Sequence, residues 1–170
     1  EREVSLPWYT PTRVVLVDTA GGDHGWVPQG WTRSWSLPTA YPDRQGVLQF
    51  VGRSSPTGVV VYRHTLFPRR YREGVFLEDW TFGRILFVPL AREGAGLRAG
   101  KPEVLLQSVG TDGFAPSDMI VGPDGALWVS IGGRRTRGAI FRIVPRDPDG
   151  SGAETAPIDR VLRAPQPLAA

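Results

Sequence analysis

The sequence predicts an all-β protein built from repeated units, and two observations support this class. A block of residues occurs twice, because Ser55-Pro56-Thr57 is matched 60 residues later by Ala115-Pro116-Ser117. Each copy continues with three short apolar runs, separated by turns rich in Gly and Asp, and no long stretch of the chain shows helical periodicity. Repetition of β-type runs at this spacing is typical of β-propeller blades rather than of helical solenoids.

The first unit, residues 54–109, is expected to form a four-stranded blade. Its first strand is centred on residues 59–62, which are β-branched and aromatic. Residues 74–79 and 84–88 follow, and the connection between them is too short for a helix, which predicts an antiparallel hairpin. Residues 103–109 complete the blade as its outer strand.

The second unit, residues 114–146, repeats this plan. An apolar run at 119–121 leads into Gly122-Pro123-Asp124-Gly125, a strong turn signal. Further strands are expected at 126–131 and 139–143.

The ends of the chain are expected to extend this architecture. Residues 1–53 are interpreted as an N-terminal part-blade with a long loop rich in Trp and Pro, and residues 147–170 as a polar tail. The expected strands in these two segments are 13–18, 47–51 and, as a last outer strand, 159–163. Because a propeller ring needs at least four blades, residues 1–146 are interpreted as the C-terminal blades of an open, partial propeller, with the remaining blades as its partners.

The amino-acid composition argues against several classes of site and partner. The chain has no cysteine, so disulfides, covalent c-type haem attachment and thiolate metal sites are not expected in it. No apolar run approaches the ~18–20 residues of a membrane helix, so direct membrane insertion is not expected. The net charge is only +3, and the arginine clusters at 69–72 and 134–137 fall in predicted turns. They are therefore interpreted as solvated loop charges, and no nucleic-acid partner is expected.

Several residues are candidates for chemistry. His24, next to Asp23, is a candidate general base, or alternatively a turn residue bonded to a carbonyl. Glu78, Asp79 and Asp118 lie at or beside strand ends. They are candidates for proton abstraction or Ca²⁺ binding, or alternatively caps that tie one blade to the next.

Aromatic residues suggest a carbohydrate surface. Trp26, Trp31 and Trp35 lie on the long N-terminal loop, and indole rings suit stacking against sugars; packing of the loop itself is the alternative. His64 follows a strand and is expected at the surface. The sequence does not identify residues that bind a particular metal.

Several motifs, in this order, carry a family resemblance: LPWYTPTRVVLV, GGDHGW, SSPTGVVVY, FPRRYREGVFLEDWTFGRILFVPL, SDMIVGPDGALWVSIGGR and GAIFRI. Over about residues 6–144 the chain resembles the glucose/sorbosone dehydrogenase-like propeller of the large membrane-bound dehydrogenase proteins of planctomycetes and verrucomicrobia. In that family a haem-binding cytochrome c domain typically follows. The resemblance implies a periplasmic or extracellular protein that oxidises a carbohydrate or other polyol hydroxyl and passes electrons to a cytochrome partner.

A more distant resemblance is to the soluble PQQ-dependent sugar dehydrogenases, which are six-bladed propellers that use calcium and a quinone. Asp118 matches the aspartate of their pattern, but the lysine that pairs with the quinone falls at Thr81, and two arginines fall at Ala115 and Ser117. PQQ carries three carboxylates that need cationic partners. The remaining candidates for that role are Arg53, Arg134 and Arg135. The alternative function is a non-catalytic propeller that binds carbohydrate or a partner domain.

Overall fold

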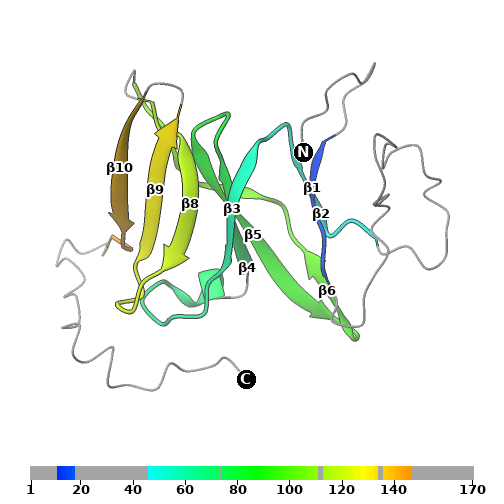
Figure 1. Ribbon diagram of the computed structural model, residues 1–170. Coiled ribbons are helices and arrows are strands. Elements are labelled where there is room, and N and C mark those ends of the chain that lie inside the picture. The colour runs from blue at the N-terminus through cyan, green and yellow to red at the C-terminus, as the bar shows by residue number, and fades with distance from the viewer. Residues whose placement is uncertain (1–10, 18–45, 73, 111–112, 134–135, 147–170) are drawn as a thin grey trace, which may run out of the picture.

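The structure is a computed structural model that describes residues 11–17, 46–72, 74–110, 113–133 and 136–146. These residues form an all-β fold (Figure 1). The strands are β1 (Thr12–Val14), β2 (Gln49–Gly52), β3 (Pro56–Val61), β4 (Gly74–Asp79), β5 (Arg84–Glu93), β6 (Gly96–Ala99), β7 (Glu103–Gln107), β8 (Pro116–Val121), β9 (Leu127–Gly133) and β10 (Thr136–Ile143). A short 3-10 helix, η2 (Arg69–Arg72), precedes β4. Within these ranges no helix has the length and apolar character to cross a membrane.

The strands form three antiparallel sheets. β1 pairs with β2, and β8, β9 and β10 form a second sheet in sequential order. The central sheet has the order β3-β4-β5. The long β5 pairs with two further strands along the edge that β4 does not occupy. Its first half pairs with β7 and its second half with β6.

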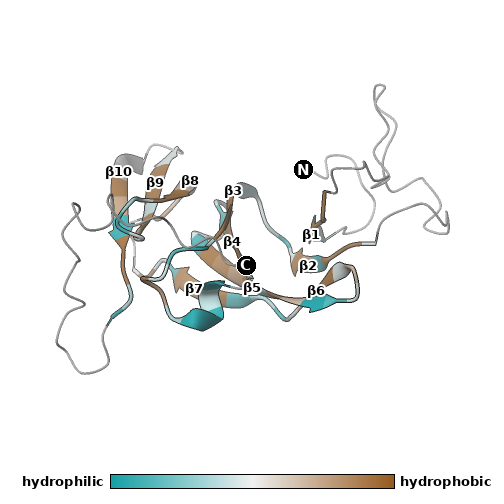
Figure 2. Ribbon diagram, turned by 90° about the horizontal axis from the view of Figure 1, so that it is seen from below, coloured by the Kyte–Doolittle hydropathy of each residue, from teal (hydrophilic) through white to brown (hydrophobic). Residues whose placement is uncertain are grey.

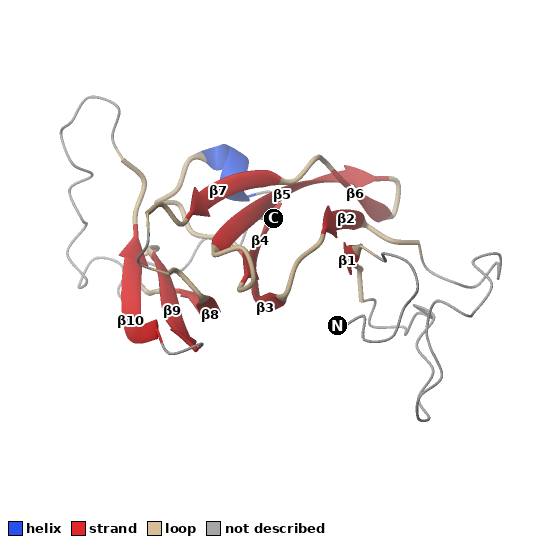
Figure 3. Cartoon of the chain, turned by 90° about the horizontal axis from the view of Figure 1, so that it is seen from above, coloured by secondary structure: helices blue, strands red, loops and turns tan. Residues whose placement is uncertain are grey.

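The central sheet is buried on both faces, and every residue of β4 is buried. Neighbouring side chains of a strand point to opposite faces. Phe76 therefore packs in one cluster with Met119 and Val129 of the β8–β10 sheet. Val75 packs on the other side in a second cluster with Val51 of β2. Figure 3 shows the resulting stack, with β1–β2 and β8–β10 on either side of the central sheet. The three sheets do not close on one another.

An aromatic cluster fills the space between the central sheet and the β8–β10 sheet. The ring centroids of Tyr62 and Phe67 are 4.8 Å apart, and those of Phe76 and Phe87 are 5.0 Å apart. The Tyr62 hydroxyl donates to the Gly125 carbonyl at 2.7 Å and accepts from the Phe67 amide at 3.1 Å. The end of β3 is thereby tied to the turn between β8 and β9.

Apolar side chains remain exposed on the outward face of the β8–β10 sheet and on the face of β3 that is turned toward the β1–β2 side of the stack. Ile120 and Ile140 are 59% and 72% exposed and lie on the face of their sheet that points away from the central sheet. Val59 and Val61 are 65% and 49% exposed, on the face of β3 shared with the buried side chains Val75 and Leu77 of β4. Figure 2 shows the hydrophobic colouring of these strands.

The predicted all-β class is confirmed, and most strand bounds lie within a few residues of expectation. Both β3 and β8 begin earlier than predicted, at prolines, because proline is tolerated as the first residue of a strand. The strand expected at 13–18 is too long, since β1 ends at Val14. The hairpin of β5 and β6 was not predicted. The expected strand 159–163 and the segment 18–45 lie outside the described residues.

We predict that Gly74→Ala destabilises the fold. A Cβ atom at Gly74 would lie 2.4 Å from the Phe87 ring and 2.6 Å from the Val88 carbonyl oxygen, so either the core or the backbone of β5 must move. We expect a loss of about 1–3 kcal/mol in the free energy of unfolding, measured with urea.

Gly96→Ala is the matched control, because the nearest atom to its added Cβ lies 3.7 Å away. Its effect should stay within about 0.5 kcal/mol. Equal effects of the two substitutions would contradict the tight packing of β4 on β5.

Candidate functional site

Most of the described positions singled out from the sequence gather at the end of the stack where β3 and β8 begin (Figure 1). We call this the loop end and define it by residues 53–55, 80–83, 114–115 and 132–133. Its loops are joined by hydrogen bonds. The indole of Trp80 donates to the Gly132 carbonyl at 3.0 Å, and the Gly132 amide donates to the Ala115 carbonyl at 2.9 Å.

Asp79 anchors the loop end. Its side chain is only 1% exposed, and both carboxylate oxygens accept hydrogen bonds. One accepts from the Ser55 amide at 3.0 Å and the other from Arg84 Nε at 2.8 Å. Arg84 extends the network, because its Nη2 donates to the Arg53 carbonyl at 3.3 Å. The geometry is that of an ion pair that holds the segment before β3 against the start of β5.

Glu78 directly precedes Asp79 in the chain, and its side chain points to the opposite face of β4, into the seam between β3 and β8. It is fully buried, and neither carboxylate oxygen has a hydrogen-bond partner among the described residues. The carboxylate fits because residue 58 is glycine: a Cβ atom there would lie 2.5 Å from Glu78 Oε2 and 3.2 Å from the Met119 amide.

Burial raises the pKa of Glu78 to about 7, and the negative charge of Asp118 raises it further, whereas the Thr57 hydroxyl opposes the shift. The opposing effect is limited, since Thr57 donates its proton to the Pro116 carbonyl at 2.7 Å. Glu78 is thus neutral in mildly acidic solution and titrates near neutrality, where an acid–base group is most useful. Its burial keeps it from contact with solvent.

The other predicted site residues are placed as follows. Asp118 is exposed, and its Oδ1 accepts from the Met119 amide at 2.9 Å. Ser117 contacts Ser130, with the two hydroxyl oxygens 3.0 Å apart. Thr81 and Arg53 are exposed at the loop end, and Ala115 is buried there. The predicted residues His24, Trp26, Trp31, Trp35, Arg134 and Arg135 lie outside the described residues.

The described part of the loop end does not fit a tricarboxylate quinone. Thr81, Ala115 and Ser117 carry no charge, and Arg84 is already paired with Asp79. Arg53 is the one cation within the described loop-end residues. Three carboxylates with one cationic partner would leave charge uncompensated. Within the described ranges, no group of three or more His, Cys, Asp and Glu side chains is arranged to hold a metal ion.

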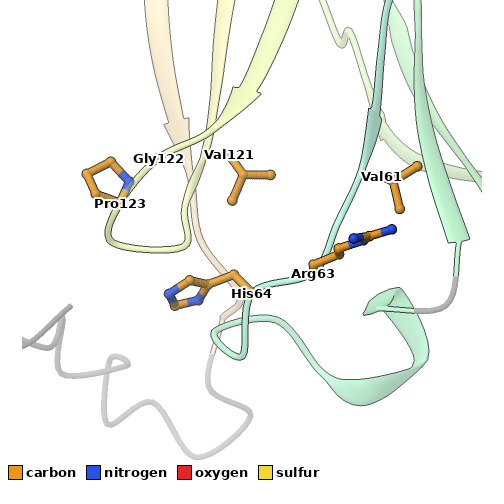
Figure 4. A pocket seen from close by; sticks show the side chains of 6 residues that line it. All are labelled: Val61, Arg63, His64, Val121, Gly122 and Pro123. Carbon is orange, nitrogen blue, oxygen red and sulfur yellow. The ribbon is translucent and has the colours of Figure 1, made fainter. Parts of the chain in front are cut away.

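A hollow of about 390 Å³ lies at the opposite end of the stack, where β3 and β8 finish (Figure 4). Its lining residues are Val61, Arg63, His64, Val121, Gly122 and Pro123. The His64 Nδ1 accepts from the Leu66 amide at 3.0 Å. Burial lowers the pKa of His64, and Arg72 lowers it too, against the raising effect of Asp124.

Sequence reasoning placed His64 at the surface and did not identify this hollow. A signal was present, because Val61 and Val121 occupy equivalent positions of the two repeats, 60 residues apart. If the two repeats pack as neighbouring blades, the strand ends at Val61 and Val121 lie side by side. The residues that follow these two valines then line the same hollow.

No protein-family model and no curated protein matches this chain. Among solved structures, one similar chain is the "putative oxidoreductase (glucose dehydrogenase)" of Thermus thermophilus, with 22% sequence identity and a TM-score of 0.50. The likeness covers 72% of this chain and 33% of that chain. At this identity it shows a shared fold over the aligned part, and this chain spans about a third of the length of the other.

We predict that Asp79→Ala lowers the free energy of unfolding by about 2–3 kcal/mol, because it leaves the Ser55 amide and the partly buried Arg84 guanidinium without their acceptor. Urea denaturation measures the effect. Glu103→Ala is the control, since its ion pair with Arg70 is exposed on both sides and 3.7 Å long. A loss no larger than that of the control would show that Asp79 does not anchor the loop end.

We predict that Glu78 makes stability fall as pH rises. The folded state keeps the Glu78 proton up to a pKa of about 7, whereas the unfolded chain releases it near 4.5. The contribution is therefore complete below pH 4.5 and is lost as pH rises through 7, with a total of at most about 3 kcal/mol. Unfolding free energies measured from mildly acidic to mildly alkaline pH test this.

Glu78→Gln should remove this part of the pH dependence, because the amide does not titrate. Glu93→Gln, at an exposed ion pair with Arg98, should retain it. The assignment is wrong if the two variants show the same slope of stability against pH.

Proposed function

We propose that this chain supplies consecutive blades of a six-bladed β-propeller of the sugar dehydrogenase type. The observation that carries the proposal is the stack itself, in which a central sheet is buried on both faces by one sheet on each side. Propeller blades pack in this way around their axis. The exposed apolar face of the β8–β10 sheet, including Ile120 and Ile140, suits a further blade.

The activity we propose for the whole protein is oxidation of a carbohydrate or polyol hydroxyl, with transfer of the electrons to a cytochrome partner in the periplasm or outside the cell. The family resemblance of the motifs supports it, and so does the solved oxidoreductase described as a glucose dehydrogenase. Within this activity, His24 is proposed as the base and Trp26, Trp31 and Trp35 as the sugar-stacking surface. Asp118 and Arg53, Arg134 and Arg135 are proposed to face the cofactor.

The described residues do not match the cofactor that the resemblance implies. That cofactor is PQQ with Ca²⁺, and the described loop end lacks the cations that such a quinone requires. Asp79 and Arg84 would serve as a support that fixes the loops, rather than as groups that touch substrate.

A second function is favoured by one observation. The positions that align with the quinone-binding lysine and arginines are Thr81, Ala115 and Ser117, which are neutral. A propeller that has lost its quinone site while keeping its fold would show this pattern. Its function would then be to bind carbohydrate or a partner domain, since fold alone does not determine chemistry.

The full-length protein, supplied with PQQ and Ca²⁺, should reduce an electron-accepting dye when a sugar substrate is added. A panel of aldoses and polyols identifies the substrate class, and a sample without sugar is the control. Absence of dye reduction with every sugar, together with retention on an unreactive polysaccharide, would exclude the dehydrogenase and support the binding module.

A further inference from the structure

We propose that the exposed face of β3 is an interaction surface for the first two strands of a preceding blade. Val59 and Val61 form this face, which we call the β3 surface, and they are 65% and 49% exposed. Apolar side chains that gather on an exposed face commonly mark a contact surface. The inference rests on the propeller proposed above and adds which strands cover this face.

The first strands of the two repeats are structurally equivalent. Val59 of β3 pairs with Leu77 of the strand that follows, and Met119 of β8 pairs in the same way with Val129. The two positions are 60 residues apart, which is the spacing of the repeat. Equivalent positions in neighbouring blades are expected to have equivalent surroundings.

In the second repeat this face of the first strand is covered by the preceding sheet. Met119 is only 3% exposed and belongs to one cluster with Phe76 and Phe87 of the central sheet. Val121, the equivalent of Val61, packs against the same cluster. β8 contacts both β3 and β4. The first strand of one blade is therefore covered by the first strands of the blade before it.

Among the described residues, no sheet gives the β3 surface the same cover. The cluster between the β1–β2 sheet and the central sheet, built around Val51 and Val75, contains side chains of β4, β5 and β6 but none of β3. Figure 3 shows β1 and β2 beside this part of the central sheet, with β3 farther along it. The β1–β2 sheet thus covers the outer strands of the central sheet and leaves its first strand exposed.

The order of strands along the chain identifies the covering strands. In the central sheet the last strand, β7, pairs with β5 and is followed by the first strand of the next sheet, β8. β2 has the same two properties, because it pairs with β1 and is followed by β3. β1 and β2 therefore correspond to the third and fourth strands of a blade. The first two strands of that blade belong before β1 in the full-length protein.

The second repeat also indicates the chemistry of the partner. The side chains that cover β8 include the aromatic rings of Tyr62 and Phe76. A hydroxyl joins the two first strands, since Thr57 donates to the Pro116 carbonyl at 2.7 Å. We therefore expect two antiparallel strands that present aromatic and aliphatic side chains to the β3 surface and a hydroxyl to the start of β3.

Thiol labelling of the full-length protein tests the β3 surface, because these 170 residues contain no cysteine. The single variants Val59→Cys and Val61→Cys are treated with a maleimide, and mass spectrometry of the peptide that carries the new cysteine gives its labelling rate. We expect both to react at least about 100-fold more slowly than Val109→Cys, because a covered thiol reacts only after local opening. Val109 is the exposed control, since it is 88% exposed and follows β7.

Ile120→Cys tests the proposed ring separately, because Ile120 lies on the outward face of the β8–β10 sheet. If Ile120→Cys is protected while Val59→Cys and Val61→Cys react as fast as Val109→Cys, the inference is overturned and the propeller stands. Fast labelling at all of these positions would reject both. Protection of Val59→Cys that disappears on dilution would also overturn the inference, since a second copy of the protein would then be the cover. Absence of sugar oxidation would not affect the result, because labelling measures exposure alone.

Discussion

The constraint on which this structure depends is that β4 is buried on both faces. A strand with no exposed residue needs a packing partner above and below its sheet, and the β1–β2 and β8–β10 sheets meet that need. Apolar residues satisfy it along most of the strand. At the end of β4, however, two consecutive carboxylates enter opposite interfaces, and burying a charge is costly unless it is paired or neutralised. On one face of β4 the carboxylate is paired, and on the other face it is neutralised.

Asp79 is paired and Glu78 is neutralised by a proton. Asp79 keeps its charge because Arg84 and the Ser55 amide approach its two oxygens. Glu78 has no such partner among the described residues, and the nearby charge of Asp118 has the same sign, so burial holds the pKa of Glu78 near 7. The first arrangement joins the segments of the loop end by hydrogen bonds. The second makes the seam between β3 and β8 sensitive to pH over the range in which proteins usually work.

The repeat explains what could be predicted from the sequence. It located both units and their strand order, and the alternation of apolar residues identified the strands. Alternation does not reveal which sheet covers which face. It therefore could not be predicted that Asp79 is paired with Arg84 while Glu78 is buried without a hydrogen-bond partner among the described residues. The glycine that makes room for Glu78 is residue 58, on another strand and 20 positions earlier. The hairpin of β5 and β6 was hidden because its turn glycines interrupt the pattern. The link from Asp79 through Arg84 to the Arg53 carbonyl likewise depends on three-dimensional packing.

The fold follows from what the two repeats share, whereas the chemistry follows from where they differ. Pro56 and Pro116 begin equivalent strands, and Val61 and Val121 end them. Directly after those valines the sequences diverge, since Arg63 and His64 are matched by Pro123 and Asp124. Because equivalent strand ends lie at the same end of the stack, Arg63 and His64 of one repeat lie beside a tight turn of the other. Two identical repeats would instead place arginine beside arginine at this hollow.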